Sequence, residues 1–373
     1  MVTLLLAYAN GANDNFKGVA TLFGSHTTSY AQALTWATLT TLLGSMMAFI
    51  LATRLVKIFS GKGLVPDAII SQPAFLIAVI VGAGLTVLLA TQTGIPISTT
   101  HSLTGALVGG GLMAVGSEIH FHVLGKSFFL PLLTSPLLAV VFTAIVYMSF
   151  KGVRRLLPIS KETCICVGQR YLPVGHLGVR SGQVIALSTL PQIDVKVDDI
   201  ATCKAEAIDV YQGSFLGVSV QKILDGLHFL SAGLVCFARG LNDTPKIVGV
   251  CVAAGLFGFH WPIVMVALVM ALGGVFSAKY VAHTVSHRIT GVNHGQGLTA
   301  NLVTASLVLF ASHLGVPVST THVSCGALFG MGAVNGQAHW RVIGGILGAW
   351  VLTLPVAAIL AGGTYFILER MVF

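Results

Sequence analysis

Long stretches of the sequence contain no Asp, Glu, Lys or Arg, among them residues 68–117, 127–150, 247–278 and 289–340. A helix needs about 20 apolar residues to cross the hydrocarbon core of a bilayer, so the stretches 68–117 and 289–340 are each long enough for two crossings. Charged residues make up 9% of the chain, against about 25% in soluble domains. The sequence therefore predicts an all-α polytopic membrane protein with about ten to twelve spans or helical hairpins.

The net charge of +8 lies largely between the apolar stretches, which indicates orientation in the membrane and contact with lipid rather than nucleic-acid binding. We expect a bilayer as the surroundings and no nucleic acid as a partner. The inner membrane of a cell is the expected location, with the inner membrane of an organelle as the alternative. The sequence leaves open whether the protein forms a homo-oligomer.

Two short motifs place an Asp and a Lys inside otherwise apolar sequence. The first reads Gly-Ala-Asn-Asp-Asn-Phe-Lys over 11–17, and the second reads Gly-Leu-Asn-Asp-Thr-Pro-Lys over 240–246. A charge at bilayer depth costs about 3 kcal/mol on insertion scales, so four such charges require a reason. In each motif the Lys follows the Asp by three residues, a spacing that places the two side chains next to each other on a helix.

A longer motif is also present twice. Residues 95–111 align without gaps on residues 316–332, and ten of the seventeen positions are identical, including Pro-x-Ser-Thr-Thr-His. The two motifs occur in the same order in each half of the chain. We therefore predict an internal repeat, with membrane repeats over 1–150 and 214–373 and with broken helices in each repeat. The breaks are expected near 13–14, 95–116, 239–244 and 316–334.

Residues 151–213 differ in kind from both repeats. They begin basic and end acidic, and two runs rich in Val and Ile, 183–187 and 193–197, are typical of short strands between Gly and Pro turns. The sequence predicts a small β-rich soluble insert between the halves. Its basic start follows a spanning helix, which favours the cytoplasmic side.

The Pro-x-Ser-Thr-Thr-His motif is typical of a helix start, because Pro disrupts the incoming helix and Ser or Thr caps the next one. A helix N-terminus offers unpaired N–H groups and about half a positive charge to an anion. Two such ends facing each other would suit a tetrahedral oxyanion, although the hydroxyls could instead only satisfy the backbone of broken helices. The candidate hydroxyls belong to Ser98, Thr99, Thr100, Ser319, Thr320 and Thr321.

The buried charges have more than one interpretation. Asp14 and Asp243 could coordinate a coupling Na⁺, or they could carry a coupling proton. Lys17 and Lys246 could face a bound anion, or they could form internal salt bridges that hold the broken helices. Arg239 has no counterpart in the first motif and is interpreted as an interface anchor or a one-sided anion contact.

His101 and His322 follow the hydroxyls and suggest either a proton relay or local hydrogen bonding. Ser98 and His101 could also form a nucleophile and its base. No acid present in a single copy completes a triad, and a hydrolase gains nothing from two copies. The sequence therefore predicts that the protein is not an enzyme.

The doubled set of motifs resembles the PiT family of inorganic phosphate transporters. The resemblance covers both membrane halves and rests on Gly-Ala-Asn-Asp and Gly-Leu-Asn-Asp, each followed by Pro-x-Ser-Thr-Thr-His. It implies a symporter that imports phosphate with Na⁺ or H⁺ and uses no other cofactor. It also implies two inverted repeats whose broken hairpins enclose a central site. The residues it assigns to phosphate and the coupling ion are Asn13, Asp14, Asn242, Asp243 and the hydroxyls at 98–100 and 319–321.

The chain departs from the family motif, which resembles Asn-Asp-Val-Ala-Asn, because the fifth position is Lys17 in one half and Lys246 in the other. We hypothesise that a tethered ammonium replaces part of what a bound sodium ion does and helps to hold the anion. Proton coupling and a different tetrahedral oxyanion, such as sulfate, are then open alternatives. An uncoupled anion channel is a further alternative, but buried Asp–Lys pairs favour a carrier that works by alternating access.

Overall fold

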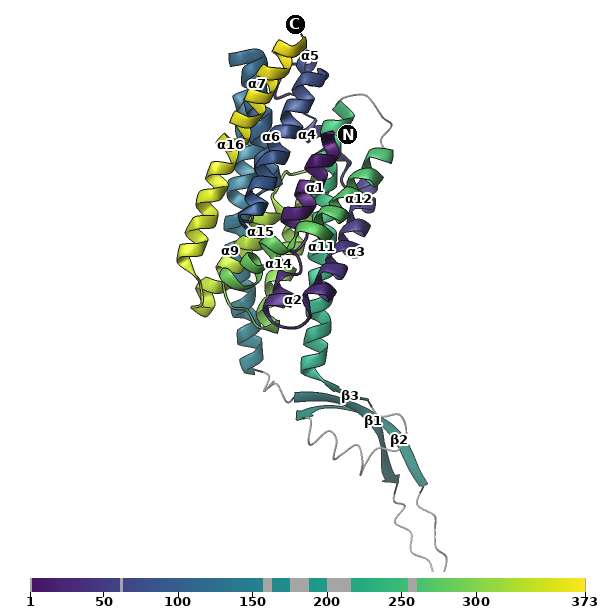
Figure 1. Cartoon of the computed structure of the whole chain (residues 1–373). Helices are drawn as coiled ribbons and strands as arrows, with labels where there is room; N and C mark the ends of the chain where they lie inside the picture. The colour runs from purple at the N-terminus through teal and green to yellow at the C-terminus, as the bar shows by residue number, and fades with distance from the viewer. Residues whose placement is uncertain are drawn as a thin grey trace, which may run out of the picture. The chain divides into compact units, whose positions relative to one another are not determined.

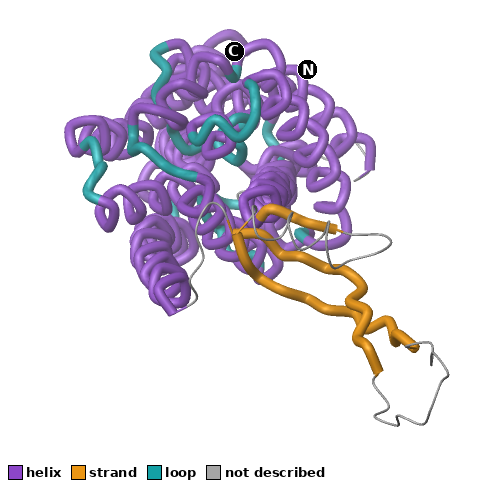
Figure 2. Tube along the Cα trace, turned by 90° about the horizontal axis from the view of Figure 1, so that it is seen from below, coloured by secondary structure: helices purple, strands orange, loops and turns teal. Residues whose placement is uncertain are grey.

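The computed structural model describes residues 2–60, 63–156, 163–174, 188–199, 216–253 and 260–372. The chain divides into a helical unit, Met1–Met148 with His228–Phe373, and a smaller unit, Ser149–Leu227. Figures 1 and 2 show the helices of the larger unit in two views, with many of them running side by side.

The elements of the first half follow each other in the order of the predicted segments. They are α1 (Val2–Asp14), α2 (Ala20–Gly24), α3 (Tyr30–Leu51), α4 (Thr53–Phe59), α5 (Asp67–Ile70), α6 (Pro73–Gln92), α7 (Thr99–Val115), η1 (Gly116–Glu118), α8 (Phe121–Val123), η2 (Leu124–Phe129) and α9 (Leu130–Leu156). The helices of the second half are α11 (Val220–Ala253), α12 (His260–Ser277), α13 (Lys279–His283), η3 (Thr284–Arg288), α14 (His294–Leu314), α15 (Thr320–Asn335) and α16 (Trp340–Val372).

Among the described residues, six helices are long and apolar enough to cross a membrane, or seven if the bent pair of α12 with α13 and η3 counts as one span. This is fewer than the ten to twelve spans or hairpins expected from the sequence. The difference arises because α1, α7 and α15 contain 13, 17 and 16 residues. At 1.5 Å per residue, helices of this length do not cross a core about 30 Å thick.

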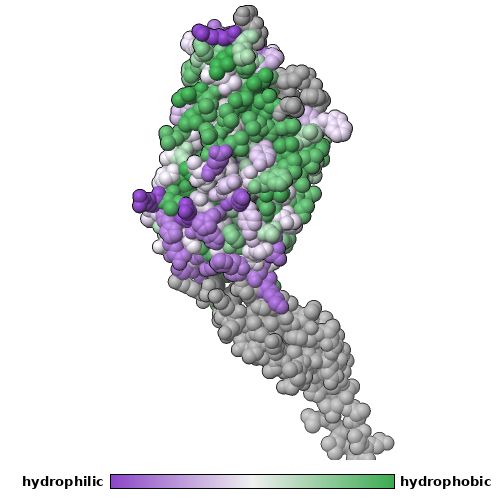
Figure 3. Space-filling model, in the orientation of Figure 1, coloured by the Kyte–Doolittle hydropathy of each residue, from purple (hydrophilic) through white to green (hydrophobic). Residues whose placement is uncertain are grey.

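The outer surface of the helical unit is apolar. Large side chains that point outward include Leu133, Val351 and Ile359, which are 68%, 72% and 73% exposed. Figure 3 shows a broad hydrophobic region on this unit, with hydrophilic residues gathered toward its ends. In water such a surface would be costly, but against lipid tails it needs no cover. The helical unit therefore has the surface of a membrane protein.

The predicted breaks before the two Ser-Thr-Thr-His copies are confirmed. The chain leaves α6 after Gln92 and begins α7 at Thr99, and it leaves α14 after Leu314 and begins α15 at Thr320. A glycine with positive φ occupies the same place in both linkers, Gly94 at +70° and Gly315 at +76°. Glycine adopts this left-handed conformation without a Cβ clash, so both chains can turn sharply toward the next helix.

The two Asp-Lys motifs do not break in the same way. The first behaves as predicted, because α1 ends at Asp14 and the chain becomes helical again only at Ala20. The prediction of a break near 239–244 is wrong. Helix α11 runs without interruption through the second motif and contains Pro245. Pro245 removes one backbone donor, a loss that a helix tolerates when surrounding groups satisfy the freed carbonyl.

Two motif glycines bring the helices of the site close together. A Cβ on Gly11 of α1 would lie 1.9 Å from the carbonyl oxygen of Met270 in α12. A Cβ on Gly240 of α11 would lie 2.2 Å from the carbonyl oxygen of Thr41 in α3. The two glycines occupy the same position in the two motifs. Small residues allow backbones to touch in a membrane, so each Asp-Lys motif is fixed by a close helix crossing.

Three strands lie in the smaller unit: β1 (Thr163–Val174), β2 (Ser188–Asp199) and β3 (Leu216–Ser219). The order is β2-β1-β3, and β1 is antiparallel to both neighbours, with Cys164 opposite Asp198 on one side and Ser219 on the other. The run 193–197 falls within β2, whereas the run 183–187 lies outside the described residues. The assignment of 151–213 as a soluble insert stays a prediction.

Candidate anion and cation site

The start of α7 and the start of α15 carry the same cap. Ser98 Oγ accepts a hydrogen bond of 3.1 Å from His101 N, and Ser319 Oγ accepts one of 3.1 Å from His322 N. These serines therefore satisfy one orphan donor at each helix start, as capping residues do. Capping of the two helices explains these contacts of Ser98 and Ser319. The threonines that follow them make other contacts.

Lys17 is buried and surrounded by oxygen atoms. Its Nζ forms an ion pair with Asp14 and donates to Asn13 Oδ1 at 2.8 Å and to Ile97 O at 2.9 Å. It also donates to Thr321 Oγ1 of the other half at 2.6 Å. The ammonium therefore links the first motif to the hydroxyl cluster of the second repeat.

Lys246 repeats three of the four contacts of Lys17, those with an acid, a backbone carbonyl and a threonine. Its Nζ lies 3.2 Å from Asp243 Oδ1 and donates to Val318 O at 2.6 Å. It also donates to Thr100 Oγ1 at 2.8 Å, which again joins one repeat to the other. Val318 and Thr100 are the counterparts of Ile97 and Thr321 in the aligned motif. The two lysines thus occupy equivalent places.

The Asp14 carboxylate accepts hydrogen bonds on both of its oxygens. Oδ2 accepts from Asn10 Nδ2 at 3.0 Å and from Thr99 Oγ1 at 3.1 Å. Oδ1 accepts from Thr321 Oγ1 at 3.2 Å in addition to the ammonium of Lys17. Every contact is made by a buried group, so the carboxylate is fully enclosed by protein donors.

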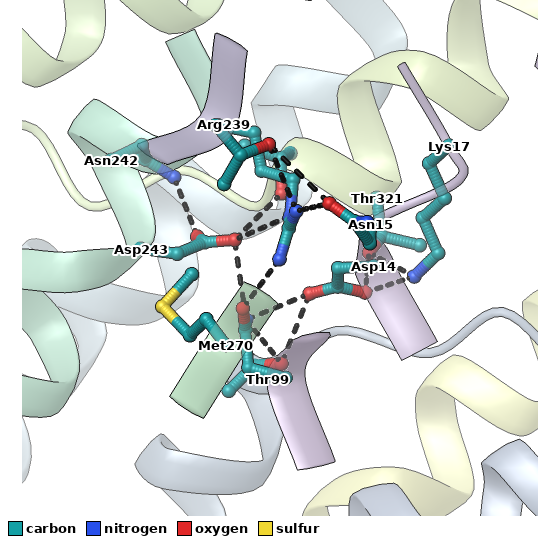
Figure 4. A network of polar contacts seen from close by, with 12 residues as sticks. Asp14, Asn15, Lys17, Thr99, Arg239, Asn242, Asp243, Met270 and Thr321 are labelled. Atoms are coloured by element: carbon teal, nitrogen blue, oxygen red, sulfur yellow. Dashed lines mark hydrogen bonds and ion pairs between the residues drawn. The ribbon is translucent and has the colours of Figure 1, made fainter. Parts of the chain in front are cut away.

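The Asp243 carboxylate is held in a similar way. Oδ2 accepts from Asn10 Nδ2 at 3.2 Å and from Thr320 Oγ1 at 3.4 Å, and Oδ1 accepts from Asn242 Nδ2 at 3.1 Å. The side-chain amide of Asn10 donates to both Asp14 and Asp243, so it connects the two carboxylates directly. Figure 4 shows the two acids on either side of this network.

Asn13 and Asn242 bind the non-helical segments that precede α7 and α15, and they also bind the helices before these segments, α6 and α14. Asn13 Nδ2 donates to Thr91 Oγ1 at 2.9 Å, and its Oδ1 accepts from Ile97 N at 3.1 Å. Asn242 Oδ1 accepts from Ser312 Oγ at 3.2 Å, and its Nδ2 donates to Val318 O at 3.2 Å. Both asparagines therefore position the cluster by binding backbone and hydroxyl groups.

Arg239, for which the sequence allows either an interface anchor or a one-sided anion contact, lies within the network and reaches both motifs. It is 1% exposed, which rules out an anchor at the membrane interface. Its Nη2 donates to Asn10 Oδ1 at 2.8 Å and its Nη1 to Asn15 Oδ1 at 2.9 Å. Its Nε is buried without a hydrogen-bond partner and lies 3.7 Å from Asp243 Oδ2.

Asn10 and Asn15 were missed as site residues. Asn10 precedes the first motif by one residue and has no unusual sequence context, so only its amide inside an apolar helix could have indicated it. Asn15 lies between Asp14 and Lys17, but its side chain turns to Arg239 rather than to either of them. Both contacts depend on an arginine more than two hundred residues away, which spacing alone does not reveal.

The charges of the cluster do not cancel. It contains three cationic side chains, Lys17, Lys246 and Arg239, against two carboxylates, Asp14 and Asp243, which leaves one positive charge in excess. All five are at most 5% exposed. A buried charge without a partner is costly, and the facing N-termini of α7 and α15 add further positive potential. The site is therefore electrostatically complementary to an anion.

The two histidines of the motifs lie side by side. His101 Nδ1 is 3.0 Å from His322 Nε2, and the ring of His322 stacks on Trp350 with centroids 3.8 Å apart. The structure thus brings together two residues that are 221 positions apart. A proton relay through them stays a prediction.

All twelve residues predicted for the site lie buried in this one region. Ten of them share the Asp–Lys–Thr network, while Ser98 and Ser319 act as helix caps at its edge. In the part of the chain that the structure describes, no group of three or more His, Cys, Asp and Glu side chains is arranged to hold a metal ion.

A multi-pass membrane protein in which short helix ends meet at a buried charged site has the architecture of a transporter. Residues 10–361 match the phosphate transporter family, and the chain belongs to this family. It is thus a transport protein of the membrane and not an enzyme.

Relatives from distant organisms match over nearly the whole chain. A protein of Pyrococcus abyssi provisionally named a phosphate permease is 27% identical over 401 residues, which cover 98% of this chain and 96% of that one. A Rhizobium meliloti protein named "probable low-affinity inorganic phosphate transporter" is 26% identical over 377 residues, covering 98% and 94%. The solved structure named "the sodium-dependent phosphate transporter" shares the fold, with a TM-score of 0.74 at 20% identity, covering 99% and 97%.

Proposed function

We propose that the protein imports inorganic phosphate together with a cation, and that phosphate binds at the Asp–Lys–Thr network between α7 and α15. The observation that carries this proposal is the excess positive charge of the network, placed where two helix N-termini meet. Family membership and the names of the relatives support phosphate as the anion.

The proposed phosphate ligands are the hydroxyl groups of Thr99, Thr100, Thr320 and Thr321, the ammonium groups of Lys17 and Lys246, and backbone N–H groups at the two helix starts. Hydroxyls donate to phosphate oxygens, and ammonium groups supply charge-assisted bonds. The unpaired Nε of Arg239 offers one more buried donor. Asn13 and Asn242 hold the broken segments at the correct distance from these donors.

We propose that transport proceeds by alternating access. In the described conformation the threonine hydroxyls bond to protein groups, and Lys17 and Lys246 tie the two halves together through Thr321 and Thr100. Entry of an anion requires these two Lys–Thr hydrogen bonds to break, because the anion competes for the same ammonium and hydroxyl groups. An occluding carrier has such a step, whereas an open channel does not.

The equivalent contacts of the two halves also support the proposal that they are inverted repeats around the site, as in other transporters with broken helices. Within this arrangement Asp14 and Asp243 are the carboxylates where a coupling ion would act, and Na⁺ and H⁺ are the two candidates. The solved structure with the same fold is named as sodium-dependent, but its identity of 20% transfers the fold alone.

The test is uptake of radiolabelled phosphate into proteoliposomes, with Na⁺ and pH gradients imposed separately and sulfate present in excess as a competitor. We expect uptake to follow a cation gradient and to resist sulfate. Loss of uptake to sulfate would move the assignment to a sulfate permease on the same scaffold. Flux that is indifferent to both gradients would contradict symport and indicate a channel.

A further inference from the structure

The oxygen atoms around Lys17 form a more complete shell than one ammonium needs. A lysine ammonium has three N–H donors, yet Nζ lies within bonding distance of four oxygens of four chemical types. They are a carboxylate (Asp14), an amide (Asn13), a backbone carbonyl (Ile97) and a hydroxyl (Thr321). Freed backbone carbonyls, hydroxyls and a carboxylate at a broken helix are the ligands that a coupling Na⁺ takes in transporters.

Lys246 fills a second shell that contains three of these four oxygen types. A carboxylate (Asp243), a backbone carbonyl (Val318) and a hydroxyl (Thr100) lie between 2.6 and 3.2 Å from its Nζ. The shells recur at equivalent positions of the two repeats, so one accidental contact does not explain them. In both, the covalently attached ammonium is the cation at the centre.

A sodium ion has no place in either shell while the lysine is there. The oxygen of Asp14 that faces the shell is already bonded to Lys17 and Thr321, and its other oxygen to Asn10 and Thr99. A second cation within about 4 Å of the ammonium would meet strong repulsion in the low dielectric of a buried site. The residues present therefore do not fit Na⁺ beside the lysines.

We propose that the ammonium groups of Lys17 and Lys246 are built-in substitutes for two coupling sodium ions, so that this protein transports its anion without sodium. This inference rests on the proposed transport function and removes Na⁺ from its candidate coupling ions. The lysines keep the positive charge and the oxygen contacts that an ion would provide. They remain with the protein, so they cannot contribute the energy of a sodium gradient.

The first arm of the test measures phosphate uptake by wild-type proteoliposomes with an inward proton gradient, in sodium chloride or in choline chloride. We expect equal uptake in both salts. A requirement of the wild type for Na⁺ would overturn the inference. If no phosphate is taken up under any gradient, the proposed function itself fails, and the second arm still tests the shells.

The second arm empties each shell with Lys17→Asn and Lys246→Asn, and uses Lys57→Asn, an exposed lysine, as the matched control. Thermal unfolding of the purified variants is followed in excess NaCl and in choline chloride. An emptied shell that binds Na⁺ raises the unfolding midpoint by about 2–4 °C in NaCl. The wild type and the control are expected to show no difference between the salts.

Uptake by the same variants gives the functional counterpart. Without Na⁺ we expect a fall of about 10- to 100-fold, because each change leaves a buried carboxylate without its cation. Addition of Na⁺, or of ammonium ions as chemical rescue, should restore part of this uptake. Variants in which neither the midpoint nor the uptake responds to Na⁺ would overturn the inference, because the shells would then not be cation sites.

Discussion

Lys17 Nζ lies 2.6 Å from Thr321 Oγ1, although the two residues are 304 positions apart in the chain. The reciprocal contact joins Lys246 to Thr100 at 2.8 Å. Each lysine therefore pairs with the acid of its own motif and binds the hydroxyl cluster of the opposite repeat. The network is held by both halves of the chain at once, and its positive charge is concentrated where these halves meet.

We expect Thr100→Val and Thr321→Val to weaken phosphate binding without unfolding the protein. Valine keeps the shape of threonine but removes a hydroxyl that we propose as a hydrogen-bond donor to phosphate. The loss of one such charged hydrogen bond is about 1.5–3 kcal/mol, or roughly 10- to 100-fold in phosphate affinity. Binding of labelled phosphate to purified protein measures it. Thr364→Val, which removes a hydroxyl bonded to its own helix backbone, serves as the control and should bind normally.

Arg239→Met should lower phosphate affinity more than it lowers stability. The substitution removes the excess positive charge of the cluster and the buried Nε donor, so the attraction for an anion falls, while Lys17 and Lys246 still pair with their acids. We expect a decrease of about 100-fold in affinity, comparable to removing a buried charge partner. Arg341→Met, at an exposed position, is the matched control. Unchanged affinity in Arg239→Met would show that the anion does not depend on this charge.

Asp14→Asn should destabilise the folded protein. The change removes the carboxylate that compensates Lys17, and breaking one partner of a buried pair costs about 3–5 kcal/mol. The expected result is a large decrease in the thermal unfolding midpoint. The double change Asp14→Asn with Lys17→Met removes both charges and should recover much of the loss. A midpoint that stays the same in the single variant would contradict the buried pair.

Gly11→Ala should disrupt the crossing of α1 with α12. The new Cβ would lie 1.9 Å from Met270 O, a backbone atom that cannot move by rotating a side chain. Gly345→Ala is the control, because its Cβ meets nothing within 4 Å and alanine favours a helix over glycine by about 1 kcal/mol. We expect Gly11→Ala to lower the thermal midpoint and Gly345→Ala to leave it unchanged or raise it slightly. Equal midpoints for the two variants would be incompatible with the close crossing.

Much of the site could be predicted because its residues are repeated. The doubled Asp-Lys and Ser-Thr-Thr-His motifs identified twelve buried site residues, and the prolines and hydroxyls indicated where α7 and α15 begin. Thr91 and Ser312, which bind Asn13 and Asn242 from equivalent positions, lie outside these motifs and were not predicted. Asp14 and Asp243 were readable from sequence because charges are rare in apolar stretches.

The site residues that differ between the two repeats could not be predicted in the same way. Asn10 and Arg239 occupy equivalent positions, each directly before the motif glycine, but differ in residue type, and their contact becomes visible only when α1 and α11 are packed together. The continuity of α11 was also missed, because Pro245 is a helix-breaking signal whose effect depends on its surroundings. The prediction of about ten to twelve spans or hairpins did not separate full crossings from short helices, because apolar composition does not distinguish the two; six or seven of the described helices are long enough to cross.

The most direct test of the central claim is equilibrium binding of labelled phosphate to the purified wild-type protein in sodium-free buffer, with sulfate as competitor and the Arg239→Met and Thr321→Val variants beside it. We predict saturable binding that sulfate displaces poorly and that both variants weaken by about 10- to 100-fold. Binding that is absent from the wild type, or that is unaffected by either substitution, would contradict the placement of the anion at this buried network.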